Sequence, residues 1–193
     1  MKHFPRLLIA AALCFTGCVA TGCSATGSGD APAPTTNASA QAPVAGFGGT
    51  DLAWIQINLA MNEELLPLLE LAPTHTENPR VLSTALQVKA FTEGELNVLR
   101  QLHTRAGLPA ENPHKGMPMP GMVTPEDVAG AGQLVGTAFD QTVTKLIREH
   151  LEQSQNLARS EEKSGTETQT RDLALQILRT REAVLSTMPS DSP

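Results

Sequence analysis

The 193-residue sequence predicts an all-α protein whose folded part is an antiparallel four-helix bundle. Four long segments carry apolar residues every three or four positions, which is the period of an amphipathic helix. No segment shows the two-residue alternation of a β-strand or its enrichment in Val, Ile and Tyr, and the chain contains no tyrosine. Loops of short or medium length between these segments favour antiparallel packing of successive helices.

The first residues have the pattern of an export signal. Lys2 and Arg6 flank the start of an apolar run from Leu7 to Phe15, which is too short to remain as a membrane span. The sequence VATGC, residues 19–23, resembles the lipobox of bacterial lipoproteins, in which the cysteine becomes the acylated N-terminus. We therefore expect residues 1–22 to be a cleaved signal peptide and Cys23 to be lipidated, with Cys18 as the weaker alternative site. The other interpretation is an ordinary signal peptide with incidental cysteines.

Composition divides the rest of the chain into a tether, one domain and a short tail. Residues 23–49 are rich in Ala, Pro, Ser, Thr and Gly, which is typical of a flexible tether. Residues 50–188 form the predicted domain, and residues 189–193 a disordered tail. All three cysteines precede the domain, so the domain has neither a disulfide nor a thiolate metal site. Loss of Lys2 and Arg6 with the signal changes the formal charge from −6 to −8, which argues against nucleic-acid binding.

The first predicted hairpin occupies the first half of the domain. Thr50 and Asp51 are suitable caps for a helix with apolar residues at helical spacing, and Pro67 predicts a kink near Leu66. Asn78 and Pro79 predict the start of a second helix, which Gly107 should end.

The second hairpin follows a connection rich in proline and methionine. Thr124 and the three residues after it predict a short capped helix. A long helix is expected at about residues 133–160, with His150 on its apolar face, and the last helix at about residues 168–188.

The two predicted hairpins are related by one constant shift. ALQV at residues 85–88 recurs as ALQI at residues 174–177, and the same shift places Glu63 on Glu152 and Leu96 on Leu185. A shift that holds across both helices predicts two hairpins derived from one by duplication. It also aligns Met61 with His150.

Three segments together resemble a known family. The helix PRVLSTALQVKAFTEGELNVLRQL, the connection GMPMPGMVTPEDVAGAG and the helix GTAFDQTVTKLIREHLEQSQNLA are similar, in this order, to the bacterial family of domain of unknown function 305. The resemblance covers about residues 50–188 and implies a ferritin-like helical bundle, because the family includes periplasmic copper-binding proteins of that kind.

The chain departs from the family at the positions expected to bind copper. The family pattern has a His-His pair in the first helix of each half and a methionine seven residues after the first histidine. Here Met61 and Asn62 match the first pair, and His150 and Leu151 match the second. Leu68 and Leu157 stand in place of the methionines, which keeps packing volume and removes two thioether ligands.

Two groups of residues are candidates for soft-metal binding. Met61 and His150 are candidates for a remnant site in the core, and the alternative is a packed, hydrogen-bonded histidine whose protonation near pH 6 alters stability. His114, Met117, Met119 and Met122 are candidates for an exposed Cu(I) or Ag(I) site in the connection. The alternative is that these methionines pack between the hairpins or lie in a plain linker.

The sequence therefore predicts a membrane-anchored, extracytoplasmic lipoprotein with weak binding of copper or silver ions. The alternative is a structural or interaction module that has lost metal binding and acts through an unidentified protein partner. We do not expect an enzyme, because no nucleophile elbow, phosphate-binding loop or zinc-protease motif is present. The one Glu-x-x-His spacing, Glu111 to His114, lies beside Pro113 and does not fit a di-iron helix.

Overall fold

The computed structural model describes residues 46–188. The predicted signal peptide, Cys18 and Cys23, most of the tether and the tail at 189–193 lie outside these residues. Within the described part every regular element is a helix, which confirms the all-α prediction. None of these helices combines the length and the apolar character that crossing a membrane requires.

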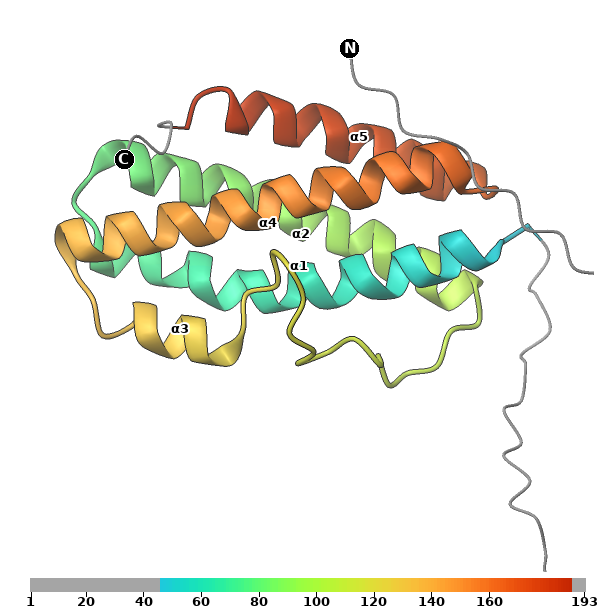
Figure 1. Ribbon diagram of the computed structural model, residues 1–193, viewed down its shortest axis with the longest axis horizontal. Coiled ribbons are helices and arrows are strands. Elements are labelled where there is room, and N and C mark those ends of the chain that lie inside the picture. Colours follow the sequence, from blue (N-terminus) through green and yellow to red (C-terminus); the bar gives the residue numbers. More distant parts are fainter. Residues whose placement is uncertain (1–45, 189–193) are drawn as a thin grey trace, which may run out of the picture. The chain divides into compact units, whose positions relative to one another are not determined.

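Four long helices form two hairpins, and a short helix lies in the connection between them (Figure 1). The elements are α1 (Gly49–His75), α2 (Pro79–Arg105), α3 (Pro125–Ala131), α4 (Gly136–Ser164) and α5 (Thr168–Leu185). The shift of 89 residues found in the sequence also separates the last residues of α1 and α4 and the first residues of α2 and α5. This regularity is expected of duplicated hairpins, although common descent itself stays a prediction.

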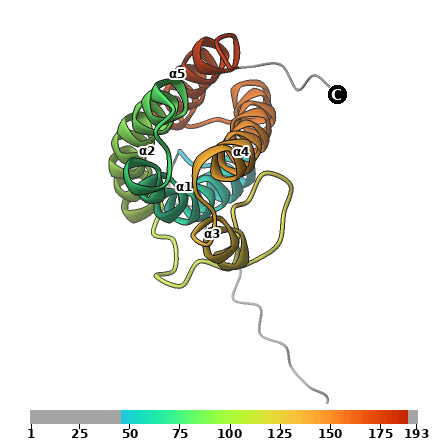
Figure 2. The same ribbon diagram turned by 90° about the vertical axis from the view of Figure 1, so that its left-hand side faces the viewer.

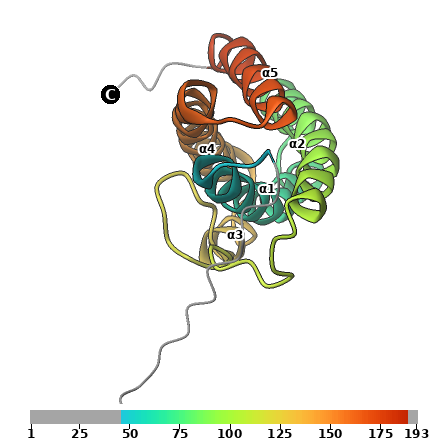
Figure 3. The ribbon, with the colours of Figure 1, turned by 90° about the vertical axis from the view of Figure 1, so that its right-hand side faces the viewer.

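Each long helix packs against two others, as the end-on views show (Figures 2 and 3). α1 contacts α2 and α4, and α5 contacts the same two helices from the opposite side. The start of α1 meets the end of α4 through Asp51 and Thr166, and the end of α2 meets the start of α5 through Arg105 and Glu167. Neighbouring helices are therefore antiparallel. α2 and α4 run in the same direction, so the connection between them, residues 106–135, returns along the length of the helices. Helix α3 lies in this connection and contacts α1 and α4.

The domain begins slightly ahead of the predicted boundary at residue 50. Gly48 is the N-cap of α1, and the Asp51 carboxylate in the first turn accepts a hydrogen bond from the Gly48 amide at 2.6 Å. Phe47, which the sequence assigned to the tether, is only 6% exposed, and the Arg105 guanidinium lies 5.5 Å above its ring. Thr50 and Asp51, the predicted N-caps, therefore lie inside α1, and Asp51 completes the cap from the third helical position.

Proline and glycine act at the other helix ends largely as predicted. Asn78 caps α2 by accepting a hydrogen bond from Arg80, and Gly107 follows the helix with a φ of +62°. α1 continues as one helix through Pro67, which is exposed, so the carbonyl group deprived of its helical hydrogen bond faces the solvent side. α5 ends at Leu185, three residues before the predicted end, because Pro189 cannot continue a helix.

Apolar side chains fill the interior in two large clusters. One surrounds Phe139 with residues of α1, α2, α4 and the end of α5, and the other surrounds Trp54 with residues of α1, α2 and α5. A fully buried ion pair crosses the interior: Arg181 of α5 donates to both carboxylate oxygens of Glu95 of α2, at 2.6 and 2.7 Å, and neither side chain is exposed.

Other groups complete this pair. Asn62 of α1 donates to Glu95 at 3.2 Å, and the Arg181 Nε atom donates to the Ser154 hydroxyl of α4 at 3.2 Å. The Arg181 guanidinium also lies 4.3 Å above the Phe91 ring. All four long helices therefore hold the pair, which gives buried charges the partners that they need.

We expect Arg181→Met to lower the free energy of unfolding by about 3–5 kcal/mol, because Glu95 would be left buried without its counter-charge. Denaturant unfolding of the variant measures this loss. The double variant Glu95→Leu with Arg181→Met should recover most of it. As a control, Arg100→Ala removes an exposed pair with Glu63 and should cost at most about 1 kcal/mol; an equal cost for the two single variants would contradict the role of the buried pair.

Candidate functional site

His150 lies on the face of α4 that is buried against the other helices. The buried residues of α4 recur every three or four positions, from Phe139 to Glu161, and His150 is one of them with 0% exposure. Ser154, one turn further along this face, accepts the hydrogen bond from Arg181. The helical period therefore places the imidazole beside the buried ion pair.

The His150 ring is held in its neutral form. Burial, and then the positive charge of Arg181, lower the pKa of His150 to about 3, while the Gly121 backbone acts in the opposite direction. The Gly121 backbone carbonyl is the one hydrogen-bond partner near the ring, and no side chain of the described part hydrogen-bonds to either ring nitrogen. His150 is thus fully buried, and the structure replaces the expected titration near pH 6 with a neutral imidazole whose ring nitrogens have no side-chain partner in the described part.

Three methionines from two parts of the chain pack together next to α4. We call Met61, Met119 and Met122 the methionine cluster: Met61 and Met122 are buried with Ala60, and Met119 is partly buried against them. Ile57 and Leu157 complete the packing. Leu157, one of the two leucines expected at methionine positions of the family, thus packs against the cluster.

A tight turn holds Met119 and Met122 against α4. The Met122 amide donates to the Met119 carbonyl group at 3.0 Å, and Gly121 between them has a φ of +70°. A Cβ atom on Gly121 would lie 2.5 Å from the Gln153 Cβ atom and 2.7 Å from the Glu149 carbonyl oxygen. Glycine is therefore required both for the backbone conformation and for the close approach, which covers the segment of α4 that contains His150.

An open cavity of about 550 Å³ adjoins this turn on the solvent side. Met119, Gly121 and Met122 line one wall, and Glu149, Glu152 and Gln153 of α4 line another. Asp127, Glu149 and Glu152 outnumber Lys145 among the charged lining residues, but Lys145 pairs with Glu149 at 3.8 Å and Arg148 pairs with Glu152 at 3.9 Å, so the excess negative charge is small.

The structure divides the candidate residues of the connection. Met119 and Met122 join Met61, whereas Met117 is 45% exposed and lies outside the cluster. His114 is partly buried, and its Nδ1 atom has no hydrogen-bond partner in the described part. The structure thus does not gather the four residues of the expected exposed site, which are His114, Met117, Met119 and Met122. The turn at Gly121 places only Met119 and Met122, the residues at its two ends, against α1 and α4.

Sequence reasoning missed the polar residues beside His150. Glu95 and Arg181 occupy buried helical positions, three residues after Thr92 and four after Ile177, respectively. A charged residue on an otherwise apolar helical face was the available signal. Asn62, which follows Met61 on α1, donates to Glu95.

The donor atoms at this place suit a soft cation. Between residues 46 and 188 no three His, Cys, Asp or Glu side chains gather into a metal-binding group. The methionine cluster and His150 instead offer thioether sulfur atoms and a neutral imidazole, which are ligands that Cu(I) accepts. The residues present therefore fit a monovalent soft metal better than a hard divalent one.

Comparisons with known proteins identify the chain's relatives. No curated protein matches it. A crystal structure of a DUF305 protein from Streptomyces coelicolor, described as a candidate secreted protein, has a TM-score of 0.64 at 18% identity and covers 72% of this chain and 89% of its own. A DUF305 fragment from Deinococcus radiodurans has a TM-score of 0.65 at 19% identity and covers 74% of this chain and 95% of its own.

These two structures share the fold with this protein. The family model, described as domain of unknown function (DUF305), matches residues 52–190, which is most of the chain. The protein therefore belongs to the DUF305 family.

Proposed function

We propose that this protein is a lipid-anchored, extracytoplasmic member of its family that binds Cu(I) or Ag(I) between the methionine cluster and His150. It has no catalytic role in this proposal, and its fold is a ferritin-like bundle of two duplicated hairpins. The observation that carries the proposal is a fully buried imidazole whose ring nitrogens have no side-chain partner in the described part, next to a turn that contributes two methionines to a cluster of three. A buried polar group without a partner is costly, so a ligand is the natural explanation for it.

The neutral state of His150 supports this proposal. A histidine must lose its proton to bind a metal. Since the pKa of His150 is about 3, the ring is already deprotonated at any ordinary pH. Burial thus removes the competition between protons and metal that an exposed histidine shows near pH 6.

The charge next to His150 favours a monovalent ion. Arg181 lies near enough to lower the pKa of His150, so it also repels a metal cation there. This repulsion grows with the charge of the metal ion, and Glu95 offsets much of it by pairing with Arg181. Neutral thioether ligands add no charge of their own, so Cu(I) or Ag(I) suits the site better than a divalent ion.

The same arginine supports the alternative function. In a family member that had lost metal binding, the positive charge of a buried arginine would take the place of the metal ion's charge. In that case the domain serves as a scaffold for a protein partner, and the methionine cluster only packs.

The methionine cluster is tested by a pair of leucine substitutions. We expect Met61→Leu with Met122→Leu to weaken Cu(I) binding at least tenfold, because two sulfur ligands are lost at nearly constant volume. The measurement is competition of the full-length protein with a coloured Cu(I) chelator. Met117→Leu is the matched control, since Met117 is exposed and lies outside the cluster. Failure of the wild-type protein to compete would favour the scaffold.

Leu157 allows a test by gain of affinity. Leu157→Met should strengthen Cu(I) binding several-fold, because the new sulfur atom would lie against the cluster. Leu68→Met makes the same chemical change in the separate core around Phe139, so its affinity should equal that of the wild-type protein. Equal affinities for the two variants would show that the cluster is not the binding site.

Anchoring is tested at Cys23. We expect Cys23→Ser to move the protein from the membrane fraction to the soluble fraction, because the proposed acyl chains are what hold it there. Cys18→Ser should leave the protein on the membrane. If Cys18→Ser left the membrane fraction and Cys23→Ser did not, Cys18 would be the lipidated residue. If both variants stayed in the membrane fraction, lipid anchoring at either residue would be ruled out.

A further inference from the structure

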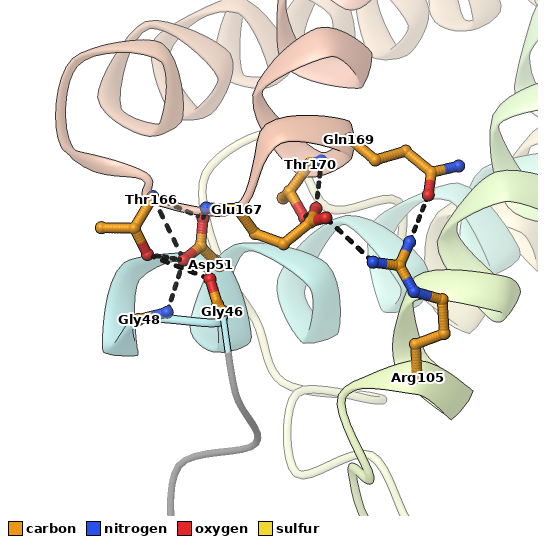
Figure 4. Close-up of polar contacts among 8 residues, drawn as sticks. All are labelled: Gly46, Gly48, Asp51, Arg105, Thr166, Glu167, Gln169 and Thr170. Carbon is orange, nitrogen blue, oxygen red and sulfur yellow. Dashed lines mark hydrogen bonds and ion pairs between the residues drawn. The ribbon is translucent and has the colours of Figure 1, made fainter.

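A second buried polar group lies at the C-terminal end of α4, where the turn to α5 meets the first turn of α1. Asp51, in the first turn of α1, has 0% exposure and accepts hydrogen bonds from the turn between α4 and α5 (Figure 4). The amide and the hydroxyl of Thr166 donate to it at 2.9 and 2.8 Å, and the Glu167 amide at 3.1 Å. With the Gly48 amide, these donors join the start of α1 to the α4–α5 turn.

Glu161, in the last turn of α4, is equally buried and lies beside Asp51. Its side chain folds against Gly165, where a Cβ atom would overlap with the Glu161 carboxyl group. The φ of Gly165 is −69°, which any residue adopts, so glycine is needed there for space alone. No amide or hydroxyl group in the described part donates to either Glu161 oxygen. The carboxyl group lies against Asp51, and this contact becomes a hydrogen bond when Glu161 carries a proton.

Two adjacent carboxyl groups shielded from water cannot both ionise. Burial, and then the hydrogen bond and the charge of Asp51, raise the pKa of Glu161 to about 8. Burial alone would also raise the pKa of Asp51, but its hydrogen bonds, led by that from Glu161, lower it to about 2. The two shifts assign the proton to Glu161 at neutral pH.

Charged groups of the neighbouring helices also act on Glu161. Arg171 of α5 favours ionisation of the carboxyl group, and Glu167 opposes it. Arg105 of α2 compensates Glu167 through an ion pair of 3.0 Å. The negative charge of Asp51 is therefore the main one that Glu161 meets.

We infer that Asp51 and Glu161 share one proton that clamps the first turn of α1 to the α4–α5 turn, and that loss of this proton opens the clamp. Ionised Glu161 would repel Asp51 inside the protein and force one of the two side chains toward water. The Thr166 hydroxyl, which is bonded to Asp51, also reaches the Gly46 carbonyl group at 3.4 Å. Opening the clamp thus loosens the point at which residues 46–48 enter the domain, while the pair of Glu95 and Arg181 stays closed.

The direction of the pH dependence follows from the raised pKa. The folded protein keeps a proton on Glu161 that the unfolded chain loses above its ordinary pKa of 4.5. The stabilising contribution of Glu161 is therefore complete below that pH and is lost as the pH rises to about 8. Asp51 contributes in the opposite sense, because its stabilisation is lost only when the pH falls from 3.8 toward 2.

Trp54 offers a direct test, because it is the only tryptophan of the chain and lies three residues after Asp51 on α1. In the full-length protein, we expect acrylamide quenching of its fluorescence to increase at least twofold between pH 6 and pH 10, with a midpoint near 8. No tyrosine is present to ionise and disturb the signal. Glu161→Gln keeps the shape and a donor for Asp51 but cannot ionise, so its quenching should be constant over this range.

Two further measurements keep the test decisive. Glu162→Gln, at the exposed neighbouring position, is the matched control and should keep the wild-type midpoint. A carbon NMR titration of the wild-type side chains should show one glutamate with a midpoint near 8, which disappears in Glu161→Gln. If that variant does not fold, the wild-type titration decides alone. Constant quenching in the wild-type protein, or a Glu161 midpoint near its ordinary value, overturns the inference.

Discussion

The buried pair of Glu95 and Arg181 is the constraint on which the arrangement of the four long helices depends. Each charge would be very costly in the interior without the other, so α2 and α5 must adopt the one register that brings them together. Asn62 and Ser154 then fix α1 and α4 in the same register through single hydrogen bonds. Apolar packing drives the helices together, but it tolerates small displacements that a two-point ion pair does not.

The pair also makes the two halves of the molecule chemically different. The shift that relates the hairpins carries Glu95 to Val184 and Thr92 to Arg181, so each half supplies one member of the pair and lacks the other. The ends of α1 and α4 and the starts of α2 and α5 obey the shift, whereas most of the buried polar residues do not. The interior holds one ion pair without net charge and one neutral imidazole, so the two halves do not present matching ligands.

Local patterns in the sequence were sufficient for the helices but not for the site. The cap at Asn78, the start of α5 at residue 168 and the short helix after Thr124 follow from neighbouring residues, and the structure has them where they were predicted. Contacts between distant residues leave no such local pattern. Arg181 and Glu95 are 86 residues apart, and Met119 and Met122 reach Met61 only because the connection has to return along the bundle past Gly121.

Helix α4 carries one unusual buried base, His150, and one unusual buried acid, Glu161, and their neutral states suit different roles. His150 is made neutral by burial next to a cation, and no side chain of the described part hydrogen-bonds to its ring nitrogens, which is a state that suits a ligand. Glu161 is made neutral by burial next to an anion and donates its proton to Asp51, which is a state that suits a contact between two segments of the chain. One helix thus carries both groups eleven residues apart, about three turns, and their neighbours rather than their own burial decide what each can do. Because Arg181 acts on His150 and Asp51 acts on Glu161, the protonation of each group depends on a different neighbour.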